Sequence, residues 1–157
     1  MSTRTTITLP GADTSPAAAR KFATRVLTEA GLGDDAIATA ALITSELVTN
    51  AVLHSMSGQG GKVRLTVVVT AGEWAQVECR DDGPLPGTAP LRAFPACPPG
   101  RERESARGLF LVSHMSTTSG VSYPDGRGLF WARLAWDAAA ERADDGALFP
   151  MPAGGAW

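Results

Sequence analysis

The sequence predicts an α/β (more closely, α+β) two-layer sandwich, in which helices pack on one face of a mixed, mostly antiparallel β-sheet. The sequence begins with two segments whose apolar residues have helical spacing. Two segments with alternating apolar and polar residues follow them. A further helix and two strands are predicted after these. The chain has 157 residues, of which 44% are hydrophobic, so it can form one domain with a packed core. A layer of helices on a sheet buries one face of each element.

The first predicted helix begins at Ser15-Pro16, an N-cap residue followed by proline at the first helical position, and it ends at Gly31. Its core face is formed by apolar residues at helical spacing: Ala19, Phe22, Ala23, Val26, Leu27 and Ala30. Asp34 is the predicted cap of a second helix, which continues through residues 44–54 and ends at the sequence SMSGQGG. Because this helix is apolar nearly all round, we expect both of its flanks to be covered.

A β-hairpin is predicted from Lys62 to Asp82, because the apolar period changes there to two. In its first strand Val63, Leu65, Val67 and Val69 alternate with polar residues, and the sequence TAGEW forms the turn. In its second strand Ala75, Val77, Cys79 and Asp81 share one parity. Asp81 is therefore predicted to point toward the core side of the sheet, and Asp82 away from it.

A proline-rich segment without periodicity extends from Gly83 to Arg107 and is too long for an ordinary connection. Such a loop is usually a lid or disordered. After it, RGLFLVSHM predicts a short helix, TTSGVSY a strand, PDGRG a turn and LFWARLAW a closing strand. The tail that ends in PMPAGGAW is expected to be mobile.

The composition gives no indication of a nucleic-acid or membrane partner. The formal charge of −2 provides no general attraction to a polyanion. No segment approaches the roughly 18 unbroken apolar residues of a membrane span, and the N-terminus lacks the apolar core of a signal peptide. We therefore expect a cytoplasmic protein. Cys79 and Cys97 lie in no CxxC motif and near no clustered His, which favours reduced thiols over a disulfide framework or a zinc site.

The second helix carries three polar residues, Glu46, Asn50 and His54, four positions apart within an arc of roughly 80° that it shares with apolar residues. Two interpretations are open. In one, the carboxylate and the imidazole are structural groups with distant partners, although a buried carboxylate is costly when its helix supplies no basic neighbour. In the other, Asn50 offers an oxygen to a hard cation, Glu46 acts as a base, and Asp81 points to the same interior. The pattern alone does not decide between them.

The sequence SELVTNAVLH resembles the N-box of the GHKL (Bergerat-fold) ATPase superfamily, and within it that of the anti-sigma-factor serine/threonine kinases, Glu-x-x-x-Asn-Ala-x-x-His. Further motifs follow in the family order. RDDGPLPG resembles the Asp-x-Gly-x-Gly box, ESARGLFLV the second glycine box and GRGLFWARL the terminal strand, while the segment at about 84–107 resembles the ATP lid. The resemblance covers roughly residues 5 to 136. It implies a histidine-kinase-like ATPase domain at 1–140 and a C-terminal tail at 141–157.

The resemblance implies three direct roles. Glu46 would be the catalytic general base that activates a protein hydroxyl, Asn50 would bind the Mg²⁺ that bridges the phosphates of ATP, and Asp81 would accept a hydrogen bond from the adenine amino group.

Further residues are implied around the nucleotide. Gly83 would allow close backbone approach to the base, and Gly108 would begin a helix whose free N–H groups cradle phosphate. Arg107 would contact phosphate; the alternative, that it is a solvated surface arginine, is equally well supported by the sequence. Ala106 occupies the position where the second box usually begins with glycine, and His54 would pack behind the ligand contacts.

By the same resemblance, the protein would sequester a sigma factor and phosphorylate an anti-sigma antagonist on Ser or Thr, and a homodimer is an open expectation. The chain departs from the family pattern at Leu85, Ala106 and Leu129, each of which adds bulk or removes a hydroxyl near the nucleotide. The alternative is a degenerate, non-catalytic Bergerat-fold module that holds a protein partner with weak or no ATP binding. A second alternative is an unrelated α/β domain in which the polar row is structural.

Overall fold

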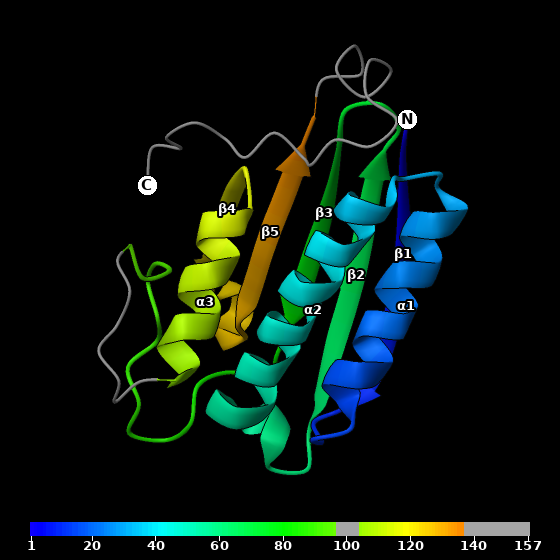
Figure 1. Ribbon diagram of the computed structural model, residues 1–157. Coiled ribbons are helices and arrows are strands. Elements are labelled where there is room, and N and C mark those ends of the chain that lie inside the picture. The colour runs from blue at the N-terminus through cyan, green and yellow to red at the C-terminus, as the bar shows by residue number, and fades with distance from the viewer. Residues whose placement is uncertain (97–103, 137–157) are drawn as a thin grey trace.

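The computed structural model describes residues 1–96 and 104–136. Its elements, in chain order, are β1 (Ser2–Pro10), α1 (Ser15–Glu29), α2 (Asp34–His54), η1 (Met56–Gly58), β2 (Lys62–Thr70), β3 (Trp74–Arg80), α3 (Glu104–Met115), β4 (Thr118–Ser122), η2 (Pro124–Gly126) and β5 (Leu129–Ala135). The strands form one sheet in the order β1-β2-β3-β5-β4, and the helices cover one of its faces (Figure 1). The predicted two-layer α+β sandwich is thus confirmed. In the described part every strand pair is antiparallel, so the sheet is not mixed.

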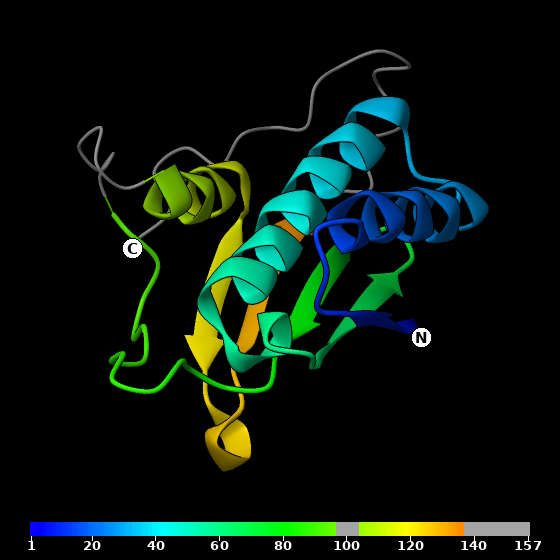
Figure 2. The same cartoon turned by 90° about the horizontal axis from the view of Figure 1, so that it is seen from below.

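Helix α2 lies between α1 and α3 over the middle of the sheet, as Figure 2 shows from below. Ile43, Leu47 and Val48 are at most 1% exposed and belong to the main core cluster. The prediction that both flanks of this helix are covered is confirmed. Its length and mean hydropathy of 1.5 also meet the criteria for a membrane span. In this fold the buried apolar residues of α2 form part of the core between the helices and the sheet, whereas Leu42 and Leu53 are exposed.

The helix starts differ from the prediction by one residue. Thr14, and not Ser15, is the N-cap of α1, and the Ser15 hydroxyl donates to the Pro10 carbonyl oxygen at the end of β1. Gly33, and not Asp34, is the N-cap of α2. Asp34 therefore lies in the first turn, where its negative charge interacts favourably with the helix dipole.

Strand β1 has no counterpart in the sequence prediction. It pairs with β2 along its whole length, from Ser2 opposite Thr70 to Pro10 opposite Lys62. Most of its residues are exposed because it forms an edge of the sheet. Threonine occurs on both parities of the strand, which removes the polar-to-apolar alternation that identifies a strand in a sequence. Its β-branched composition was the available signal.

The predicted hairpin of β2 and β3 is confirmed, with Arg64 opposite Arg80 and Thr70 opposite Trp74. Asp81 follows β3 on the core side and is only 4% exposed, whereas Asp82 is exposed, as the parity predicted. Val68 is also buried although it lies on the other face, because β2 has neighbours on both sides.

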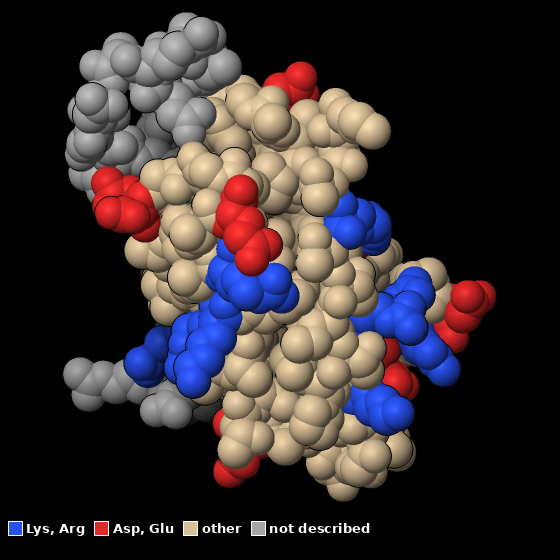
Figure 3. Space-filling model, turned by 90° about the vertical axis from the view of Figure 1, so that its right-hand side faces the viewer, with Lys and Arg blue, Asp and Glu red and all other residues tan. Residues whose placement is uncertain are grey.

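The basic side chains on the side of the molecule shown in Figure 3 lie mainly in two groups, separated by uncharged surface. Acidic atoms adjoin the basic atoms in both groups, and further acidic side chains lie near the upper and lower edges of the view. Two ion pairs occur among the described residues: Arg25 with Glu29 at 3.4 Å on α1, and Arg4 with Glu78 across the sheet. This side therefore presents no continuous basic surface.

Candidate functional site

Asp81 lies at the end of β3 with one carboxylate oxygen fixed by the backbone. Its Oδ1 accepts hydrogen bonds from the N–H groups of Gly83 at 2.7 Å and Gly128 at 3.0 Å. Its Oδ2 has no hydrogen-bond partner among residues 1–96 and 104–136. Burial raises the pKa of Asp81, the two N–H groups lower it, and the nearby charge of Asp82 raises it. One oxygen is thus held in place while the other can accept from a ligand.

Two glycines make this arrangement possible. A Cβ at Gly128 would lie 2.5 to 2.6 Å from both oxygens of Asp81. Gly83 has φ +101°, and a Cβ there would lie 2.7 Å from the Gly126 carbonyl oxygen. Any side chain would therefore separate the three segments that meet at Asp81. Gly128 was not among the predicted site residues, although the Gly-Arg-Gly sequence ahead of β5 was a signal for it.

The Asp81 loop is attached to the C-terminal end of α2. The Met56 N–H donates to the Gly83 carbonyl oxygen at 2.8 Å, and Ser55 forms a β-bridge with Pro84. Asp82 has a structural role here: its Oδ2 accepts from the Lys62 backbone N–H at 2.9 Å. These contacts place Asp81 and Gly83 near the half of α2 that carries the N-box.

Glu46 and Asn50 lie one turn apart on α2, and both are half-buried. Neither has a hydrogen bond or ion pair within the described part of the chain, so their polar atoms remain available to a ligand. A Cβ at Gly108 would come within 2.1 Å of Glu46 Oε2. The backbone of α3 therefore lies directly against the Glu46 carboxylate, which unites the N-box and the second glycine box.

Helix α3 begins earlier than predicted. Gly108 does not begin it, because the helix already starts at Glu104, and Ala106 and Arg107 lie in its first turn. Alanine has the highest helix propensity, which accounts for a helix that extends over Ala106. Any free N–H groups that could cradle phosphate belong to this turn and not to Gly108. The last four residues assigned to the lid, 104–107, are thus helical, and 97–103 lie outside the described residues.

His54, the last residue of α2, is exposed and is not packed in the core, so its place behind the ligand contacts stays a prediction. Leu129 pairs with Arg80, which gives it the parity opposite to that of Asp81. This departure from the family pattern therefore does not lie beside the Asp81 carboxylate. Leu85 is half-buried and accepts a turn hydrogen bond from the Thr88 N–H at 3.0 Å.

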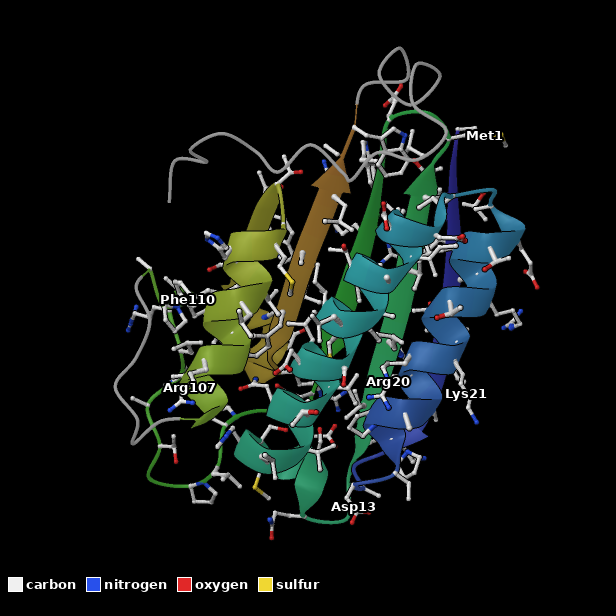
Figure 4. All side chains as sticks on the ribbon, in the orientation of Figure 1. Met1, Asp13, Arg20, Lys21, Arg107 and Phe110 are labelled. Carbon is white, nitrogen blue, oxygen red and sulfur yellow. The ribbon has the colours of Figure 1, made fainter. Side chains whose placement is uncertain are left out.

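Aromatic residues that the sequence did not single out hold the described part of the lid. The Tyr123 hydroxyl accepts from the Leu91 N–H at 2.9 Å. Phe94 stacks on Phe130 with 5.9 Å between ring centroids. On α3, Arg107 is exposed, and Figure 4 shows it on the side that faces the lid. Contacts of this kind join residues far apart in the chain, so local sequence patterns carry no signal for them.

No group of three His, Cys, Asp or Glu side chains that could hold a metal ion occurs in the part of the chain that the structure describes. Asn50 is the predicted metal ligand, and a single protein oxygen suits Mg²⁺, which keeps waters and phosphate oxygens as its other ligands. Cys79 is a free, buried thiol, and burial raises its pKa well above the usual range, with a further increase from Asp81. Cys97 lies outside the described residues.

Comparison with known families gives a decisive match. The family model of the histidine kinase-like ATPase domain matches residues 9–136, which is more than half of the chain. The chain belongs to this family. No curated protein sequence matches it significantly. The histidine kinase-like ATPase domain includes Glu46 and Asn50, the Asp81 loop, the lid and β5, and the predicted GHKL resemblance is confirmed. A GHKL-type domain implies ATP as the ligand, typically together with Mg²⁺.

Proposed function

We propose that this domain binds ATP and Mg²⁺ and transfers the terminal phosphoryl group to a Ser or Thr of a protein, in the manner of the anti-sigma-factor kinases. The observation that carries the proposal is the placement of Glu46. Its side chain extends from a rigid helix, its carboxylate lies against the Gly108 backbone, and it has no hydrogen-bond or ion-pair partner among the described residues. A carboxylate held in this way can take the proton of an incoming hydroxyl.

The nucleotide would occupy the space between these groups. Asp81 Oδ2 would accept from the adenine amino group, Asn50 would hold Mg²⁺, and the first turn of α3 would face the phosphates. When bound, Mg-ATP would supply the phosphoryl group and the charge neutralisation that its transfer requires. The fit rests on the Asp81 oxygen that the backbone leaves open and on the unpaired Asn50 amide.

The protein partners would be a sigma factor, which the domain sequesters, and an anti-sigma antagonist, which it phosphorylates in the cytoplasm. Four apolar side chains of α2, η1 and α3 that such a partner would cover are 36% to 60% exposed: Leu42, Leu53, Met56 and Leu111. A homodimer remains part of this proposal. Isothermal titration calorimetry with ATP in the presence and absence of Mg²⁺, followed by phosphoryl transfer to candidate antagonists, tests it directly.

A non-catalytic binding module is the second candidate, because α3 is helical at Ala106, where the family usually has glycine. We expect Ala106→Gly to tighten Mg-ATP binding several-fold, with a smaller effect on ADP, if the helical turn at Ala106 must rearrange around the phosphates, because glycine adopts conformations that a Cβ penalises by roughly 1 to 2 kcal/mol. Calorimetry with both nucleotides measures this. Ala38→Gly, at an exposed position of α2, is the control for lost helix propensity. Equal or weaker ATP binding by Ala106→Gly would mean that alanine already fits this turn.

Gly108→Ala tests the contact between α3 and the proposed base. The added Cβ would overlap the Glu46 carboxylate, which must move because it is the flexible end of a side chain. We expect phosphoryl transfer to fall about tenfold, while the free energy of unfolding stays equal or rises by up to about 1 kcal/mol, since alanine is the better helix former. Gly33→Ala, at the N-cap of α2, is the control for transfer alone, because nothing lies within 4 Å of the added Cβ. Normal transfer by Gly108→Ala would contradict a precise placement of Glu46.

A further inference from the structure

Tyr123, the single tyrosine of the chain, connects β4 to the lid. Its hydroxyl oxygen accepts a hydrogen bond from the Leu91 N–H, 32 residues earlier in the sequence. Both residues are half-buried and pack against the core cluster. Because a sheltered N–H without an acceptor costs free energy, this hydrogen bond stabilises one position of the lid at Leu91.

Ring contacts fix the neighbouring lid residues. Phe94 stacks on Phe130 at an interplanar angle of 16°, and Tyr123 meets the Phe130 ring edge-on, with 6.3 Å between centroids. The Ser113 hydroxyl donates to the Phe110 carbonyl oxygen within α3 at 2.9 Å and also lies 3.4 Å from the Pro95 carbonyl oxygen. The lid from Leu91 to Pro95 is therefore held at several points against β5, the residue after β4, and α3.

The same end of the sheet carries Asp81. Gly128, which donates to Asp81, is two residues from Phe130 and shares its parity on the chain. Burial raises the pKa of Tyr123, the Leu91 N–H lowers it, and the charge of Asp81 raises it. The phenol thus keeps its proton at neutral pH.

We propose that Tyr123 is a positioning residue that couples the lid to the adenine end of the site: its hydroxyl fixes the lid at Leu91, beside the strand end that holds Asp81. The coupling to the nucleotide rests on the proposed function, whereas the fixing of the lid does not. Tyr123→Phe is the appropriate variant, because it keeps the ring and its contact with Phe130 and removes only the acceptor.

Hydrogen exchange without nucleotide tests the fixing of the lid. We expect the Leu91 amide to exchange about tenfold faster or more in Tyr123→Phe than in the wild type, while the Gly128 amide is unchanged. Thr28→Val is the matched control, since it removes a hydroxyl that bonds only within α1, to the Thr24 carbonyl oxygen. Equal exchange at Leu91 in Tyr123→Phe and the wild type would overturn the proposal.

Titration with adenosine and with Mg-ATP tests the coupling. We expect Tyr123→Phe to weaken Mg-ATP binding several-fold and adenosine binding by less than about twofold, because the lid and not the base contact is altered. We also expect Mg-ATP to slow exchange at Leu91 in the wild type more than in the variant. Unchanged Mg-ATP affinity together with faster exchange at Leu91 would overturn the coupling. If the wild type bound neither ligand, the proposed function would fail, and the exchange result would still decide whether Tyr123 fixes the lid.

Discussion

Asp81→Asn is expected to weaken adenine-nucleotide binding by about 2 kcal/mol or more, which is roughly a 30-fold increase in Kd. The N–H groups of Gly83 and Gly128 both point at Oδ1, so the carbonyl oxygen of an asparagine must take that place. Its NH₂ group then replaces Oδ2 and presents a donor to the adenine amino group, which is also a donor. Calorimetric titration with ADP measures the loss.

Asp82→Asn is the matched control, because the adjacent carboxylate accepts from the Lys62 backbone and has no place in the proposed pocket. It should leave the Kd for ADP unchanged. If Asp81→Asn bound ADP as tightly as the wild type, Asp81 would not contact the base.

The raised pKa of Asp81 also predicts how its replacement changes stability with pH. In the native state the neutral carboxyl is favoured, so its contribution to stability is fully present below the ordinary pKa of 3.8 and is lost as the pH rises through the raised value. Asparagine does not titrate, so the free energy of unfolding of Asp81→Asn should rise relative to that of the wild type between pH 3 and pH 7. Chemical denaturation at both pH values measures this difference. Thermal stability should fall much less than binding does.

Periodicity predicted α1 and the β2–β3 hairpin, because their apolar residues recur at helical spacing and at every second position. Helix α2 is apolar nearly all round and was predicted from the capping residue before it and the glycine-rich sequence after it. Strand β1 was missed because threonines on both parities hide the alternation. The start of α1 was misplaced by one residue because the Ser15 hydroxyl bonds to Pro10 on a neighbouring element and not to its own helix.

The sequence likewise predicted some features of the candidate site and missed others. The inward direction of Asp81 followed from the parity of a single strand, and the structure confirms it. The contact of Asp81 with Gly128 joins positions 47 residues apart, and only the pairing of β3 with β5 brings them together. The predicted start of α3 was wrong because residues before Gly108, which include Ala106 with its high helix propensity, continue the helix back to Glu104. Local sequence patterns thus predict which face of a helix or strand a side chain occupies. Contacts between different elements depend on how the strands pair, which a local pattern does not contain.

Glu46→Gln is expected to leave Mg-ATP binding nearly intact and to lower phosphoryl transfer to a cognate antagonist by about 10² or more. Glutamine has nearly the same shape, so the contact with Gly108 and the fold should persist, but its amide cannot take a proton from the attacking hydroxyl. The separation of the two effects is the informative result, because a group that acted on the nucleotide would weaken binding as well.

Transfer rates under single-turnover conditions, together with calorimetric titration of Mg-ATP, measure this separation. Glu29→Gln, the same substitution at an exposed position of α1, is the matched control and should change neither quantity. Normal transfer by Glu46→Gln would show that Glu46 is not the base. If the wild type bound an antagonist tightly but transferred no phosphoryl group to any candidate, the protein would be a binding module. The helical turn at Ala106 would then be the structural feature to test as the reason for the missing transfer.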